Sequence, residues 1–149
     1  MLIRHATTSD TDVLVELIRQ LGYEITRDAL SANLHIYNKT GGYVFVSEEE
    51  EQVTGFISGS MIPLFHMQES MFRITALCVH EQYREKGVGK ELVLKVEELC
   101  RKKECFQLEV TSGAHRNKEA HLFYESLGYT AYKGKRFTKK LDSVSTHVR

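Results

Sequence analysis

The amino-acid sequence predicts an α+β fold in which helices flank a mixed, mostly antiparallel central sheet. Two early segments carry apolar residues at helical spacing, later segments are short apolar runs, and one of these passes through a glycine turn into another helix. At 149 residues the chain is long enough to bury the core of one domain. We expect a single domain over residues 1–141 and a flexible tail over residues 142–149, where no core pattern continues.

The N-terminal segments predict one strand followed by two helices. Leu2–Ala6 is expected to form a short strand. Ser9 and Asp12 have the spacing of a capping box before a helix that Gly22 ends. Thr26 is expected to cap a second helix. The buried side of that helix carries three large residues, Leu30, Leu34 and Tyr37.

Strands occupy the middle of the chain. Gly41-Gly42 ends the second helix before a hairpin of the strands Tyr43–Ser47 and Val53–Met61, which a charged turn joins. A further strand, Phe72–Val79, leads into a glycine turn and a third helix. The apolar side of this helix repeats every three or four residues, at Val88, Leu92, Val96 and Leu99.

The C-terminal third continues with a strand over Phe106–Thr111 and a helix over Arg116–Leu127. A closing hairpin of Tyr129–Tyr132 with Phe137–Leu141 is expected to follow. This order of elements gives a mostly antiparallel sheet with one parallel pairing near its centre.

The turn Arg84-Glu85-Lys86-Gly87-Val88-Gly89 joins an apolar strand directly to the third helix. Glycines let the backbone approach a ligand closely, and the free N–H groups and dipole of a helix start suit an anion. A Walker loop is excluded, because Arg84 stands in place of its first glycine and Glu91 in place of its Ser or Thr. The dinucleotide fingerprint is excluded because Leu92 replaces its third glycine. We therefore expect a turn that binds a diphosphate.

A second motif occupies Asn117–Tyr129, one helix and one strand later. On a helix ended by Gly128, the side chains of Asn117, His121 and Tyr124 share one face, where they can hydrogen-bond an amide-bearing ligand. The two motifs together resemble Arg/Gln-x-x-Gly-x-Gly/Ala and Asn-x-x-Ala-x-x-x-Tyr-x-x-x-Gly-Phe/Tyr, the signatures of the GCN5-related N-acetyltransferase (GNAT) superfamily. The resemblance covers residues 2–141 and implies the acyl-CoA N-acyltransferase fold.

This resemblance implies acetyl-CoA as the co-substrate and no metal. In the superfamily a β-bulge parts two strands, and the pantetheine arm of the coenzyme pairs with the exposed strand edge. Here that edge is carried over to Leu77, Cys78 and Val79. Asn117 is expected to hydrogen-bond the arm and Tyr124 to lie near its sulfur. The pyrophosphate is expected to be wrapped by Arg84, Glu85, Lys86, Gly87, Val88, Gly89 and Lys90, with Arg116 and Lys118 as candidates for the nucleotide phosphate.

The implied reaction is direct attack of a primary amine on the thioester carbonyl. An alkyl ammonium has a pKa of about 10.4, so at neutral pH the amine must first lose a proton. The backbone N–H of Cys78 or Val79 could hold the oxyanion, and Tyr124 could donate a proton to the departing thiolate.

The base is less determined by the sequence. Many members of the superfamily carry a glutamate on the strand before the glycine turn, but this chain has Arg73 there. Glu109 is the favoured candidate, because its Leu-Glu-Val strand resembles that of ribosomal-protein N-terminal acetyltransferases and alternation can direct it towards the cleft. An ordinary exposed carboxylate paired with a lysine fits the same alternation. The other candidates are Ser112, His115 and His121.

The sequence says little about the identity of the acceptor. The resemblance places it against Leu21-Gly22-Tyr23, Phe65, His66 and Tyr132–Arg136, and these residues form no dense acidic patch. The turn 111–116 is longer than in ribosomal acetyltransferases and resembles enzymes that modify aminoalkyl compounds or aminoglycosides, so we expect a small primary amine. The alternatives are a protein or peptide N-terminal or lysine acetyltransferase and a non-catalytic acyl-CoA-binding regulatory module.

Composition argues against other partners. The chain has 20 basic and 20 acidic residues, whereas binding to nucleic acid or an anionic membrane favours a basic excess. Three cysteines without metal-type spacing predict reduced thiols. Because no secretory signal and no membrane-spanning run is present, we expect a cytoplasmic protein. Two-fold dimers are frequent in the superfamily, so a homodimer stays open.

Overall fold

The structure, a computed structural model, describes residues 1–111 and 118–142. The chain divides into two compact units, residues 1–113 and residues 114–149. The first unit holds the sheet and three long helices, and the second holds one helix and the segment after it. The single domain over residues 1–141 stays a prediction. The tail expected over residues 142–149 lies, apart from Asp142, outside the described residues.

A five-stranded sheet forms the first unit. Each strand pairs antiparallel with the next, except that β4 and β5 are parallel. The parallel pair, expected near the centre, lies at an edge of the sheet because no strand follows β5 among the described residues. The strands confirm the predicted ones with small shifts at their ends. In chain and spatial order they are β1 (Leu2–His5), β2 (Gly42–Glu49), β3 (Gln52–Ile62), β4 (Met71–Val79) and β5 (Gln107–Val110).

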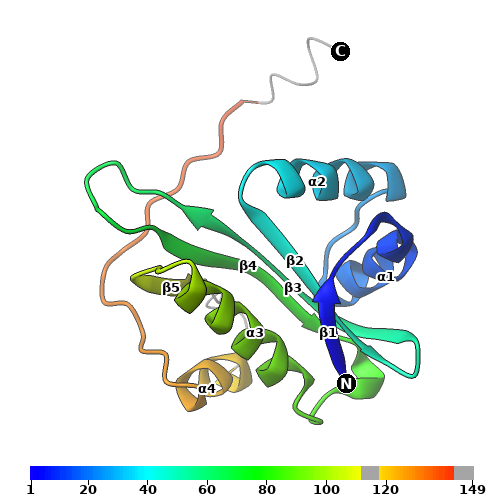
Figure 1. Ribbon diagram of the computed structural model, residues 1–149. Helices are drawn as coiled ribbons and strands as arrows, with labels where there is room; N and C mark the ends of the chain where they lie inside the picture. Colours follow the sequence, from blue (N-terminus) through cyan, green and yellow to red (C-terminus); the bar gives the residue numbers. More distant parts are fainter. Residues whose placement is uncertain (112–117, 143–149) are drawn as a thin grey trace. The chain divides into compact units, whose positions relative to one another are not determined.

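Helices cover both faces of this sheet. α1 (Thr11–Leu21) and α2 (Arg27–Lys39) lie on one face, and α3 (Val88–Lys102) lies on the other (Figure 1). Apolar side chains from α1, α2 and the strands form one buried cluster, which includes Leu14, Leu17, Leu34, Val46, Phe56 and Cys78. The buried side of α3 consists of Val88, Leu92, Val93, Val96 and Cys100, while Leu99 is half-buried.

Turns and helix ends mostly follow the predicted signals. Gly22 ends α1 at a φ of +108°, and the Thr26 hydroxyl accepts a hydrogen bond from the Ala29 N–H at 3.1 Å. The charged turn between β2 and β3 is shorter than expected, because the strands extend into it. It narrows to Glu50 and Glu51, whose φ angles of +49° and +65° suit a tight two-residue hairpin turn.

The predicted capping box at Ser9 and Asp12 is wrong by two residues. A short 3₁₀ turn, η1 (Thr8–Asp10), precedes α1, and the box belongs to that turn. The Thr7 N–H donates to the Asp10 carboxylate at 2.8 Å. Asp12 is instead exposed and pairs with Arg27 at 3.3 Å. Both spacings satisfy the motif, and tertiary contacts of Asp10 select the earlier one.

Those contacts come from Arg4 on β1. Its two Nη atoms each donate to an Asp10 carboxylate oxygen at 2.9 Å, and its Nε donates to Glu48 at 2.9 Å. Asp10 is only 5% exposed. The hydrogen bonds from Arg4 hold the pKa of Asp10 below its ordinary value, against the opposing effect of burial. The network fastens the start of α1 to the edge of the sheet.

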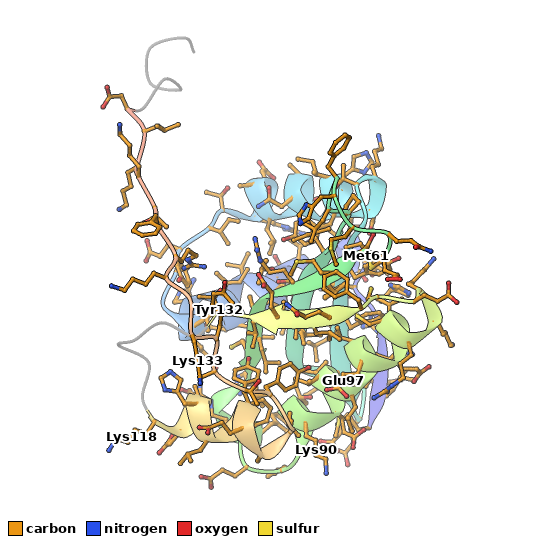
Figure 2. The ribbon with its side chains drawn as sticks, turned by 90° about the vertical axis from the view of Figure 1, so that its left-hand side faces the viewer. Met61, Lys90, Glu97, Lys118, Tyr132 and Lys133 are labelled. Atoms are coloured by element: carbon orange, nitrogen blue, oxygen red, sulfur yellow. The ribbon has the colours of Figure 1, made fainter. Side chains whose placement is uncertain are left out.

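The predicted closing hairpin is not formed. In the second unit, α4 (Lys118–Ser126) is followed by residues 127–142, which contain no strand. Tyr132 and Phe137 are 88% and 89% exposed, and Figure 2 shows the Tyr132 and Lys133 side chains projecting from this segment. A two-stranded hairpin is marginal without a packed face.

The three cysteines are free thiols, as expected. Cys78 and Cys100 are buried, and burial raises the pKa of the Cys100 thiol to about 12. None of the described helices is both long enough and apolar enough to cross a bilayer.

Replacing Asp10 by Asn tests the Arg4 network. The variant removes a charge-assisted pair from a buried site, so we expect a loss of about 2 kcal/mol in unfolding free energy at pH 7. Because the folded-state pKa of Asp10 is lowered, its contribution is complete above the unfolded value of about 3.9 and declines as pH falls through the folded value. Urea denaturation at pH 7 and pH 3 measures both effects. Asp12→Asn, at an exposed pair, is the control; equal losses in both variants contradict the assignment.

Candidate active site

The pairing of β4 with β5 ends before β4 does. Their parallel register runs only from Met71 and Gln107 to Ile74 and Val110, although β4 continues to Val79. The register between β3 and β4 also shifts here, because Ser58 pairs with Ala76 and Gly59 with Ile74, which leaves Thr75 as a bulge. Bulges bend a strand and increase its twist. β4 therefore bends at Thr75, and beyond this point its edge on the side of β5 has no partner strand among the described residues.

Gly59 allows this bulge to form. A Cβ atom at this position would lie 2.4 Å from the Phe72 ring and 2.5 Å from the Arg73 carbonyl oxygen. Either distance is too short for a real contact, so a side chain at residue 59 would push β3 and β4 apart at the point where the register shifts. The glycine in the middle of a strand thus marks a close backbone approach.

The alternation of the antiparallel ladder decides which backbone groups reach the open edge. The His80 N–H donates to the Thr54 carbonyl at 2.8 Å, so His80 and, by alternation, Cys78 direct their polar groups towards β3. Leu77 and Val79 then direct theirs to the other side, where β5 has ended. Of the two oxyanion donors considered, this favours Val79 over Cys78. The Cys78 side chain is buried, and its thiol donates to the Leu17 carbonyl at 3.2 Å.

The glycine turn follows directly. A 3₁₀ turn, η2 (Glu81–Tyr83), leads to Gly87, whose φ of +83° lets α3 begin at Val88. The first α-helical hydrogen bond of α3 runs from the Glu91 N–H to the Gly87 carbonyl at 3.1 Å. The N–H groups of residues 88–90 precede that bond at the positive end of the helix dipole. Figure 2 shows Lys90 at this end of the first unit, opposite Met61.

Several contacts fix the turn to the strand edge. Arg84 Nε donates to the Val79 carbonyl at 3.1 Å, which joins the turn to the last residue of β4. The Glu81 N–H donates to the side-chain oxygen of Gln20 on α1 at 3.0 Å. The Tyr83 hydroxyl donates to Gln52 at 3.3 Å. Gln20 and Gln52 were not predicted as site residues, and no local pattern marks them because their partners lie far away in the sequence.

Glu109 and Arg73 form an ion pair across β4 and β5. They are register partners, and Arg73 Nε donates to the Glu109 carboxylate at 2.5 Å. The Arg73 and Glu109 side chains are 47% and 35% exposed. The expected alternation of β5 is consistent with this pairing, but the partner is the arginine at the position of the usual glutamate rather than a lysine. The pair lies one residue before the strands part.

The second unit carries the tyrosine motif. Tyr124 lies in the last turn of α4, and its ring centroid is 5.0 Å from that of Phe123 and 5.9 Å from that of Tyr129. The Tyr129 N–H donates to the Tyr124 carbonyl at 3.1 Å, and Gly128 has a φ of +94°, so the helix ends at the predicted glycine. Lys118 begins the helix and His121 is exposed. Four candidates lie outside the described residues: Ser112, His115, Arg116 and Asn117.

The residues expected to contact the acceptor come from separate segments. Leu21 is half-buried at the end of α1 and Tyr23 is exposed after it. Phe65 and His66 are exposed in the connection between β3 and β4. The range Tyr132–Arg136 belongs to the second unit and is exposed. Their role stays a prediction.

Comparison with known proteins gives consistent results. A profile of the Acetyltransferase (GNAT) family matches residues 11–129. The aminoalkylphosphonate N-acetyltransferase of Salmonella typhimurium is 32% identical over 144 residues, which is 93% of this chain and 90% of that protein. The glucosamine-6-phosphate N-acetyltransferase of Arabidopsis thaliana has a similar fold, with a TM-score of 0.80, 21% identity and coverage of 95% of this chain and 98% of that one. An acetyltransferase of Trypanosoma brucei has a TM-score of 0.79, 22% identity and coverage of 93% and 99%.

Replacing Gly87 by Ala tests the glycine turn. No atom lies within 4 Å of the added Cβ, so the change acts through the positive φ, which costs an L-residue about 1–2 kcal/mol. If the turn relaxes to relieve this strain, the N–H groups at the start of α3 move, and we expect the Kd for coenzyme A to rise about tenfold. Isothermal titration calorimetry measures it.

Gly22→Ala is the matched control, because Gly22 also has a positive φ and an open environment but ends a different helix. Both variants should lose similar stability, and only the Gly87 variant should lose coenzyme affinity. Unchanged affinity in the Gly87 variant contradicts the assignment of this turn to the pyrophosphate.

Proposed function

This chain belongs to the GNAT family of acetyltransferases and is an acetyl-CoA-dependent acetyltransferase, and we propose that it acetylates the primary amine of a small molecule. The observation that carries the proposal is the end of the β4–β5 pairing at Ile74 and Val110, beyond which β4 continues to Val79 beside the glycine turn. An extended pantetheine arm can pair with the backbone groups of Leu77 on this edge, as an added strand does. Its pyrophosphate then meets the N–H groups at the start of α3.

The residues of the turn have complementary roles in this proposal. Gly87, Val88, Gly89 and Lys90 supply main-chain N–H groups, while Arg84 and Lys86 supply positive charge. Arg84 also holds the Val79 carbonyl, so the strand edge and the phosphate-binding turn keep a fixed spacing. Lys86 lies over the Tyr83 ring, with Nζ 5.5 Å from its centroid. Asn117 is proposed to hydrogen-bond the arm.

Glu109 and Tyr124 are the residues we propose for proton transfer. Glu109 lies one register position before the strands part, where its carboxylate can bind the acceptor ammonium and receive its proton directly or through water. Tyr124 is proposed as the general acid that protonates the departing thiolate, because a tyrosine with a reference pKa near 10 is protonated at neutral pH. The backbone N–H of Val79 is the proposed oxyanion donor.

A small acceptor is favoured by the bacterial relative that acts on aminoalkylphosphonates, since the match spans nearly all of both chains. The described parts of the proposed site also offer no concentrated negative charge for a basic peptide.

The proposal is tested by acceptor-dependent release of thiol from acetyl-CoA. We expect turnover with small primary amines and little with peptides that offer an α-amine or a lysine. Turnover with peptides alone would establish a protein acetyltransferase instead. Coenzyme binding without thiol release for any acceptor would establish a binding module.

Replacing Tyr124 by Phe removes the proposed acid. We expect kcat to fall about 10²- to 10⁴-fold, the usual scale of general acid catalysis, with little change in the Kd for acetyl-CoA. Tyr129→Phe is the matched control, because Tyr129 packs beside Tyr124 in the same unit and the motif accepts Phe there. A Tyr124 variant that keeps wild-type kcat excludes this role.

A further inference from the structure

We propose that Arg73 binds an acidic group on the acceptor, so that the enzyme acts on small zwitterions whose amine lies a few bonds from an oxyanion. This inference rests on the proposed function, because it names the acceptor class of the same site. The shared chemistry is a phosphonate or a carboxylate.

Arg73 keeps hydrogen-bonding capacity for such a group. Its Nε donates to Glu109, and among the described residues its guanidinium has no other hydrogen-bond or ion-pair partner. The two Nη groups therefore offer four N–H donors in a planar arrangement that fits an oxyanion. A half-exposed cross-strand ion pair contributes only about 0–1 kcal/mol to stability. The fold thus gains little from placing an arginine here.

Arg73 has both polar and apolar neighbours on its face of the sheet, and Met71, two residues before it on this face, is buried. Ser60 is its register partner on β3, and Ser58 lies two residues along the same strand and on the same face. The Ser58 and Thr75 hydroxyls are 3.0 Å apart. Further along this face Phe56 is buried in the cluster beneath α1 and α2. Side-chain hydroxyls, a guanidinium and a carboxylate therefore lie together around Arg73.

The position along β4 suits a short acceptor. Arg73 and Leu77, the first open-edge residue named above, pair with Ser60 and Ile57 across the bulge, so they lie three register positions apart, which is about 10 Å of strand. The long Arg73 side chain covers part of that span, and a molecule with few bonds between its amine and its acid covers the rest. A long polyamine or an extended peptide needs no cation at this position.

The opposite charges of Glu109 and Arg73 also complement the two charges of a zwitterion. Glu109 and Arg73 present a carboxylate and a guanidinium side by side. An ammonium near Glu109 and an oxyanion on the Nη groups of Arg73 add two intermolecular pairs to the internal one, so no charge is left without a partner. A neutral amino alcohol satisfies only Glu109. Selectivity for an acid-bearing acceptor follows.

The test uses three acceptors with the same two-carbon spacing: 2-aminoethylphosphonate, β-alanine and ethanolamine. We expect the wild-type enzyme to prefer one or both acids over ethanolamine in kcat/KM. In Arg73→Gln that preference should fall about 10- to 100-fold, mostly through KM, which is the scale of a lost charge-assisted hydrogen-bonded pair. Arg73→Lys should retain part of it. Comparing the two acids distinguishes recognition of a phosphonate from recognition of a carboxylate. A loss of preference over ethanolamine for either acid in Arg73→Gln supports the proposal.

Arg19→Gln is the control, because Arg19 is an exposed arginine paired with Glu16 on α1, outside the site. Urea midpoints for all variants show whether each is folded. If Arg73→Gln lowers kcat/KM equally for acids and ethanolamine, or changes neither, Arg73 is structural and the inference fails. If the wild-type enzyme acetylates ethanolamine as well as the acids, the inference fails while the proposed function stands. If it acetylates no small amine, the proposed function fails.

Discussion

The one-residue bulge at Thr75 is the constraint on which the rest of the structure depends. Before it, β4 pairs with β3 and β5; after it, β3 is the partner of β4 among the described strands. The same insertion reverses the alternation of the strand, so that Ile74 and Leu77 share a face although they are an odd number apart. Arg73 lies before the bulge, on the face that also carries Ser58 and Ser60, and the backbone of Leu77 lies on the open edge beyond it.

The glycine turn is useful only because it is fixed to that edge. The start of a helix can hold an anion anywhere, but a two-part ligand requires a defined spacing between the strand and the helix. Buried residues on α3, such as Val88 and Leu92, hold the helix against the sheet. Arg84 joins the turn to Val79. The site is therefore a property of the packing between one strand and one helix.

Two arginine–carboxylate groups show how surroundings decide the role of identical side chains. Arg4 contacts two carboxylates, and its partner Asp10 is buried, so the group fastens β1 and β2 to α1. Arg73 contacts Glu109 in a half-exposed position beside the parting strands. The first group has its donors occupied and serves the fold. The second has donors to spare, which is the physical basis for assigning it to a ligand.

The sequence by itself determined the features that depend on neighbouring residues. The strands, the ends of α1 and α4 at Gly22 and Gly128, and the glycine turn follow from local spacing and backbone freedom, and two motifs indicated the family. Tertiary structure decided the rest. The capping box lies at Thr7 and Asp10 because Arg4 on β1 contacts Asp10. The predicted hairpin over residues 129–141 did not form, because a two-stranded hairpin is marginal without a packed face. The register of β4 and β5 brings Arg73 beside Glu109. No local pattern encodes this pair, because side chains 36 positions apart meet only when their strands pair.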